Sequence, residues 1–161
     1  MSPAQIELAV TLYRDRGLFL DTNLILLLVV GARDPRAVAR HRRTSDYTAD
    51  DVEILRRFCG LFARLVTLPH VLTEASDLLH SGEEQAVLRS LGIEVWEEQS
   101  IASREAAAAP EYAYVGLADA AILERIVGSY FVLTADDKLA RAIWARSGHA
   151  LHFTQLVAAA Q

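Results

Sequence analysis

Cysteine and lysine are nearly absent from this sequence. Cys59 is the single cysteine, so the chain forms no internal disulfide and has no cysteine cluster for zinc. Lys138 is the only lysine, and it directly follows the acidic pair Asp136 and Asp137. With no covalent staple, stability must come from a hydrophobic core, which a chain of 161 residues is long enough to build as one domain spanning residues 1 to 161.

Long apolar runs and a leader sequence are also missing. The most apolar stretch, Leu24 to Val30, is too short to cross a bilayer. The first residues carry neither the basic flank nor the apolar segment of a signal peptide. With 52% hydrophobic and 23% charged residues, the composition excludes a disordered or fibrous chain. We therefore expect a soluble, cytoplasmic protein that does not contact a membrane.

A net positive charge, the usual mark of a nucleic-acid-binding protein, is missing as well. The formal net charge is -5, which taken alone argues against RNA or DNA as a partner. The basic residues are unevenly placed, however, because one short segment holds Arg33, Arg36, Arg40, Arg42 and Arg43. Net charge therefore does not exclude a nucleic acid.

The apolar pattern predicts strands that alternate with helices. Strands are expected over 17–22, 64–67, 92–96, 130–134 and 150–153, and helices over segments that begin at or near Pro3, Leu24, Thr48, Pro69, Gly116 and Asp136. Residues 31 to 47 form a polar connection, and residues 97 to 112 a loop or short helix. Such alternation implies right-handed crossovers, and hence an α/β fold with a mostly parallel sheet covered by helices on both faces.

An aspartate ends the first predicted strand, in the stretch "LFLDTNLIL". The residues Leu18, Phe19 and Leu20 read as a buried strand of a parallel sheet. A carboxylate at the mouth of such a strand is unfavourable unless hydrogen bonds, a cation or a helix N-terminus compensates its charge. Asp21 therefore needs a partner.

Three more acids occupy comparable positions. Asp136 follows the strand predicted at 130–134, and ligands of parallel sheets lie beyond the carboxyl ends of the strands. On a helical wheel, Asp119 falls among the apolar residues of its helix, and Glu74 lies at the border of the apolar face of its own helix. These acids and Asp21 are thus expected to face one cleft.

Each acid also has a purely structural interpretation. Asp119 in a first helical turn can satisfy free backbone N–H groups, and Asp136 can cap the helix that follows it, with a capping box between Thr134 and Asp137 as a rival arrangement. Glu74 can be solvated, and Asp21 can accept hydrogen bonds in a tight turn. Four structural acids in one cleft would repel one another, however, unless a cation separated their charges.

A divalent cation is the compensation that this set of acids predicts. Mg²⁺ and Mn²⁺ prefer oxygen ligands, which carboxylates supply. A cation held by Asp21, Glu74, Asp119 and Asp136 can activate water and stabilise the charge that develops on a phosphodiester.

Four segments of the chain together resemble the signature segments of PIN-domain nucleases, in the order that family shows. They are "LFLDTN" (18–23), "LPHVLTEASDLL" (68–79), "GLADAAILERI" (116–126) and "YFVLTADDKLA" (130–140). The resemblance implies a three-layer α/β/α sandwich and metal-dependent hydrolysis of RNA. Carried over by position, it makes Asp21, Glu74, Asp119 and Asp136 the metal-binding and catalytic acids.

The same resemblance names supporting residues and partners. Asn23 or Thr22 is expected to support Asp21, with Thr134 as a further polar neighbour, and Asp136 is preferred over Asp137 as the fourth acid because of its spacing after Thr134. Small single-domain members of the family resemble VapC toxins, ribonucleases that an antitoxin protein silences and that are usually dimeric. RNA, an antitoxin and a second copy of the chain are thus the expected partners.

Other functions fit the sequence less well or remain open. A phosphatase of the haloacid dehalogenase type requires a second aspartate where Asn23 stands, and a receiver domain requires an acidic pair before the phosphorylated aspartate. A PIN-like module that binds RNA or protein without cleaving is the stronger alternative. Arg40, Arg42 and Arg43 are candidates for RNA contacts at the rim of the cleft, although a solvated loop explains them equally well.

Overall fold

The computed structural model describes residues 1 to 160 and shows an α/β fold built on one parallel sheet. Five strands are arranged in the order β3-β2-β1-β4-β5, and every neighbouring pair is parallel. The strands are β1 (Leu18–Leu20), β2 (Leu65–Thr67), β3 (Trp96–Glu98), β4 (Phe131–Thr134) and β5 (Ala150–His152).

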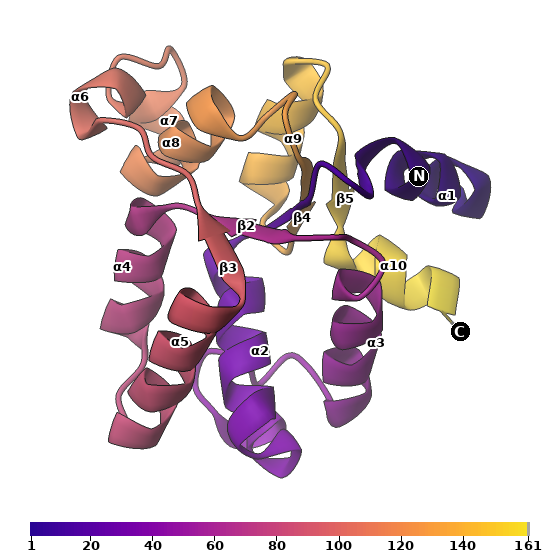
Figure 1. Cartoon of the computed structure of the whole chain (residues 1–161), viewed down its shortest axis with the longest axis vertical. Coiled ribbons are helices and arrows are strands. Elements are labelled where there is room, and N and C mark those ends of the chain that lie inside the picture. The colour runs from indigo at the N-terminus through magenta and orange to yellow at the C-terminus, as the bar shows by residue number, and fades with distance from the viewer. Residues whose placement is uncertain (161) are drawn as a thin grey trace.

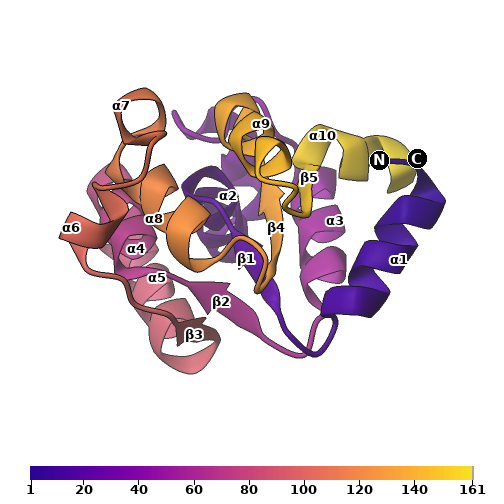
Figure 2. The same ribbon diagram turned by 90° about the horizontal axis from the view of Figure 1, so that it is seen from above.

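Helices cover both faces of this sheet, so the fold is the predicted three-layer α/β/α sandwich. Figure 1 shows α2 (Thr22–Arg33), α3 (Ala49–Cys59), α4 (Pro69–Leu78) and α5 (Gly82–Glu94) on one side. On the other side lie α6 (Ser103–Ala106), α7 (Tyr112–Val115), α8 (Leu117–Arg125) and α9 (Asp137–Ala145). Seen from above, α1 (Pro3–Tyr13) and α10 (Phe153–Ala160) bring the two ends of the chain together at one end of the sheet (Figure 2).

The central strand is enclosed on all sides. Leu18, Phe19 and Leu20 of β1 are at most 1% exposed, as the continuous apolar run predicts for a strand with helices on both faces. Leu24 to Val30 form the middle of α2 and are also buried, because this helix packs between the sheet, α3, α4 and α5. No helix among residues 1 to 160 is long and apolar enough to cross a membrane.

Two local predictions differ from the structure. The strand expected over 92–96 is instead the end of α5, a helix that the apolar pattern does not reveal, and the strand begins only at Trp96. Ser81 and Glu84 form a capping box that starts α5, and Gly92 lies inside this helix at a position where a Cβ would meet no atom within 4 Å. The polar connection predicted for 31–47 contains the last turn of α2 and the short 3₁₀ helix η1 (Pro35–Arg40).

Other local predictions are confirmed. Thr48 and Asp51 form the expected capping box at the start of α3. Pro69 begins α4 and Pro3 begins α1, both in the first turn, where proline is tolerated. The strands at 65–67, 131–134 and 150–152 lie within the predicted segments.

The close packing of α2 against α3 can be tested at Gly31. A Cβ there would lie 2.6 and 2.7 Å from the two methyl groups of the buried Val52. We expect Gly31→Ala to lower the free energy of unfolding by about 1 kcal/mol or more, because overpacking outweighs the gain in helix propensity. Gly92→Ala in α5 is the matched control and should raise it by about 0.5–1 kcal/mol. Urea unfolding measures the free energy of unfolding of both variants. Equal changes of the same sign in the two variants would contradict the close packing of α2 against α3.

Candidate active site

The strand order reverses at one place in the sheet, and two of the predicted acids lie there. From β1 the chain moves outward to β2 and β3, and it then crosses back to β4 on the other side of β1. Such a switch point leaves a crevice at the carboxyl ends of the two strands, where ligands of open α/β sheets bind. Asp21 directly follows β1, and Asp136 follows β4 by two residues.

Asp21 is buried, and hydrogen bonds compensate its charge. One carboxylate oxygen accepts the backbone N–H of Leu24 at 2.9 Å, which makes Asp21 the N-cap of α2. The other accepts the hydroxyl of Thr134 and the backbone N–H of Ala135 at 2.7 Å. Burial nevertheless raises the pKa of Asp21, and the charge of Asp136 adds to this, while the three hydrogen bonds oppose it.

Thr134 connects the two acids of the switch point. Its hydroxyl donates to Asp21 and accepts the backbone N–H of Asp136 at 2.9 Å. Oδ1 of Asp136 in turn accepts the backbone N–H groups of Lys138 at 2.6 Å and Leu139 at 3.0 Å. Asp136 is therefore the N-cap of α9, as its structural interpretation predicts, and its Oδ2 makes no hydrogen bond within residues 1–160.

Glu74 reaches the same place from α4. Its Oε2 accepts the hydroxyl of Thr22 at 2.6 Å, and Thr22 directly follows Asp21. Glu74 is otherwise exposed to solvent. The first turn of α2 thus carries the N-cap Asp21 and also holds Glu74 in place.

Asp119 comes from the first turn of α8, and its position is not explained by capping. Gly116, with a φ of 89°, turns the chain between α7 and α8, and α8 has no side-chain cap. No hydrogen bond to the Asp119 carboxylate is found within the described part of the chain. Burial raises its pKa to about 7, and the charges of Asp136, Glu74 and Asp21 contribute in that order. The structure therefore brings the other three predicted acids within electrostatic reach of Asp119.

Lys138 is the cation of this acidic group, and the sequence analysis did not assign it a role. Its charge lowers the pKa of Asp119, opposing the effect of the neighbouring acids. Its ammonium nitrogen lies 5.0 Å from the centre of the Tyr114 ring, and Tyr114 is 60% exposed. The signal in the sequence was the single lysine placed immediately after two aspartates.

The supporting residues are arranged differently from the prediction. Thr134 supports Asp21, whereas Thr22 binds Glu74 instead. The Asn23 side chain makes no hydrogen bond within residues 1–160. Asp137 is exposed and lies near Arg141 and His152, on the outer side of α9.

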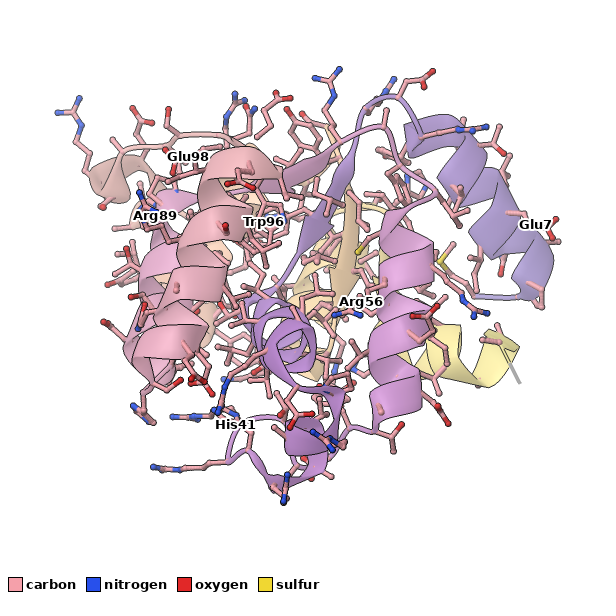
Figure 3. All side chains as sticks on the ribbon, turned by 60° about the horizontal axis from the view of Figure 1, so that its bottom comes forward. Glu7, His41, Arg56, Arg89, Trp96 and Glu98 are labelled. Carbon is pink, nitrogen blue, oxygen red and sulfur yellow. The ribbon has the colours of Figure 1, made fainter. Side chains whose placement is uncertain are left out.

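The arginine-rich segment does not form the rim of this cleft. Helix α2 has 12 residues and therefore carries the chain about 18 Å away from Asp21 before the segment begins. Arg33 pairs with Glu83 at 2.6 Å and Glu84 at 3.2 Å in α5. Figure 3 shows His41 beside the start of α5, where its ring lies 3.8 Å from Glu84. The predicted RNA contacts Arg40, Arg42 and Arg43 are thus remote from the acids.

The acids do not form a ready-made metal cluster. Within residues 1–160, no three His, Cys, Asp or Glu side chains are grouped as ligands of one ion. The chain also matches no known protein-family model, no curated protein and no solved structure with which it was compared. Interpretation of the site therefore rests on its own geometry.

The electrostatic strain at Asp119 can be measured as stability. A carboxyl group with a pKa of about 7 in the folded state and about 3.9 in the unfolded chain destabilises the fold progressively as pH rises from about 4 to about 7. We expect Asp119→Asn to raise the free energy of unfolding in EDTA at pH 8 by about 1 kcal/mol or more.

The same variant at pH 4 is the internal control, because Asp119 is then protonated and asparagine should bring little gain. Urea unfolding at both pH values gives the comparison. Destabilisation by Asp119→Asn at pH 8 would instead assign this carboxylate a structural role.

Proposed function

We propose that this protein is a divalent-metal-dependent endoribonuclease of the PIN-domain type. The observation that carries the proposal is that the charges of Asp136, Glu74 and Asp21 all act on the half-buried Asp119 near the switch point of a parallel sheet. These residues come from four separate segments, and each was predicted from the sequence. An acid whose pKa is raised by burial together with specific charged neighbours, as that of Asp119 is, is a candidate functional residue.

The donor groups suit Mg²⁺ or Mn²⁺ in kind. Hard cations prefer carboxylate oxygens, and the carboxylate of Asp119 and Oδ2 of Asp136 are not engaged in hydrogen bonds within residues 1–160. Glu74 and Asp21 would complete the set. A bound cation supplies a water of lowered pKa and stabilises charge on the phosphodiester.

The residues of the chain have separable tasks in this proposal. Thr134 fixes the relative positions of Asp21 and Asp136 through its two hydrogen bonds. Thr22 holds Glu74. Lys138 offers positive charge to a phosphate that the acids alone would repel, and the exposed Tyr114 ring beside it offers a surface on which a base can stack.

A catalytically silent RNA- or protein-binding module is the second candidate. The absence of a ready-made metal cluster within residues 1–160 favours it. The resemblance to VapC toxins extends the first proposal to a cytoplasmic toxin with an antitoxin partner and a homodimeric state. A cleavage assay separates the two candidates, because only the nuclease requires its acids for turnover.

Cleavage should depend on Mn²⁺ and on the acids that are not needed as helix caps. We expect wild-type protein to cleave single-stranded RNA with Mn²⁺ and not with EDTA. Glu74→Gln and Asp119→Asn should each lower the cleavage rate at least about 100-fold, because each removes a charge that holds the cation. Asp137→Asn, next to Asp136 but exposed, is the control and should change the rate no more than about twofold. Equal rates in all variants would exclude the nuclease.

Phosphate binding is expected at Lys138 and not at the arginine-rich segment. RNA binding in EDTA should weaken in Lys138→Ala, and the slope of log affinity against log salt should flatten by about 0.7 for the lost contact. The triple variant of Arg40, Arg42 and Arg43 to alanine should keep the wild-type slope, because these residues lie at the far end of α2. Fluorescence anisotropy across a salt series measures both. A flatter slope in the triple variant alone would reverse this assignment.

A further inference from the structure

Helix α4 presents a second face that the core covers only in part. Val71 and Ala75 are fully buried and pack inward. The residues three, four, seven and eight positions after His70 lie on the same side of the helix as His70. They are Thr73, Glu74, Asp77 and Leu78, and all of them line one pocket together with His70.

This pocket adjoins the candidate active site. Its volume is about 810 Å³, within the range of sites that bind small molecules. Opposite α4 it is bounded by residues 101–103 at the start of α6 and by Leu117 and Ala118 at the start of α8. Glu74 belongs to both the pocket and the acidic group, and Ala118 directly precedes Asp119.

The chemistry of the walls excludes a phosphate and favours a base. Leu78, Ile101 and Leu117 supply apolar surface, and no Arg or Lys of residues 1–160 lines the pocket. The charged groups are the carboxylates of Glu74 and Asp77, which only accept hydrogen bonds when ionised. A ligand that suits this pocket is therefore largely apolar and presents N–H donors to these carboxylates.

Asp77 is the polar group of the pocket with capacity for a ligand. Asp77 makes no hydrogen bond or ion pair within residues 1–160. His70 bonds through Nε2 to the Ser103 hydroxyl at 3.1 Å, and its Nδ1 is buried. Asp77 thus offers both carboxylate oxygens to a ligand, whereas the bond between His70 and Ser103 joins α4 to the facing wall of the pocket.

We propose that this pocket binds a guanine base of single-stranded RNA beside the cleaved phosphodiester, with Asp77 as the specificity-determining residue, an inference that rests on the proposed nuclease function. Guanine presents N1–H and an N2 amino group side by side, and these two donors match the two oxygens of one carboxylate. Adenine, cytosine and uracil place a ring nitrogen or a carbonyl acceptor next to their donor, which a carboxylate repels. Proteins that recognise single-stranded RNA commonly read base edges of this kind.

Nucleoside binding tests the pocket without requiring catalysis. Titration calorimetry in EDTA should show that guanosine binds the wild-type protein more tightly than adenosine, cytidine and uridine. Inosine, which lacks the N2 amino group, and 1-methylguanosine, which lacks N1–H, should each bind at least about tenfold more weakly, because each loses a hydrogen bond to a charged acceptor.

Asp77→Asn should lower guanosine affinity at least about tenfold and abolish the preference over inosine. Asp15→Asn changes an exposed aspartate outside the pocket and should leave the guanosine affinity and the preference over inosine unchanged. Equal binding of all four nucleosides, no nucleoside binding at all, or an unchanged preference in Asp77→Asn would each overturn the proposal. The absence of all nucleoside binding would point to an apolar segment of a protein partner as the occupant.

Cleavage of RNAs that differ only at one position distinguishes this proposal from the nuclease proposal. Both proposals are supported if the wild type cleaves faster beside guanine in the presence of Mn²⁺ and Asp77→Asn cleaves at a rate that does not depend on the base. Cleavage without any base preference, together with equal nucleoside binding, overturns the guanine pocket and leaves the nuclease standing. Selective guanosine binding without cleavage supports the pocket and overturns the nuclease.

Discussion

The buried carboxylate of Asp21 is the interaction on which the arrangement of this site depends. It joins two segments that are far apart in the sequence, because its donors come from the first turn of α2 and from Thr134 and Ala135 at the end of β4. Hydrogen bonds to a charged group are stronger than those between neutral groups, and a buried charge without them is very unfavourable. The ends of β1 and β4 are therefore held in register where the strand order reverses.

The other acids gather around this fixed point under less compensation. One carboxylate oxygen of Asp136 caps α9, and Glu74 accepts a hydrogen bond from one hydroxyl group. Asp119 accepts no hydrogen bond within residues 1–160. Burial raises the pKa of Asp119, and repulsion by the neighbouring acids adds to this. A half-buried carboxylate without a hydrogen-bond donor is unfavourable for folding, which is why this group of acids carries the functional proposal.

The basic residues show a division between structure and function. Arg146 pairs with Glu111 and Glu124 and donates to the backbone of Leu123, so it ties the end of α9 to α7 and α8. Arg33 ties the end of α2 to α5 in the same way. These arginines stabilise contacts between helices, and Lys138 is left beside the acids, where positive charge counteracts their repulsion of a polyanion.

The sequence by itself determined the fold class and most helix starts, because hydrophobic periodicity, capping boxes and first-turn prolines are local signals. It also identified Asp21 and Asp136, since a carboxylate that ends an apolar strand is visible without any structure. It missed α5 and displaced β3, because the alternation around Gly92 fits a strand as well as a helix and only pairing with β2 at Trp96 decides the register. Tertiary structure alone decided that Thr134 supports Asp21 while Thr22 supports Glu74, that Lys138 lies beside Asp119, and that the arginine-rich segment lies a helix length away. Those facts depend on the order of strands in the sheet and on the length of each crossover, which bring together residues up to 113 positions apart.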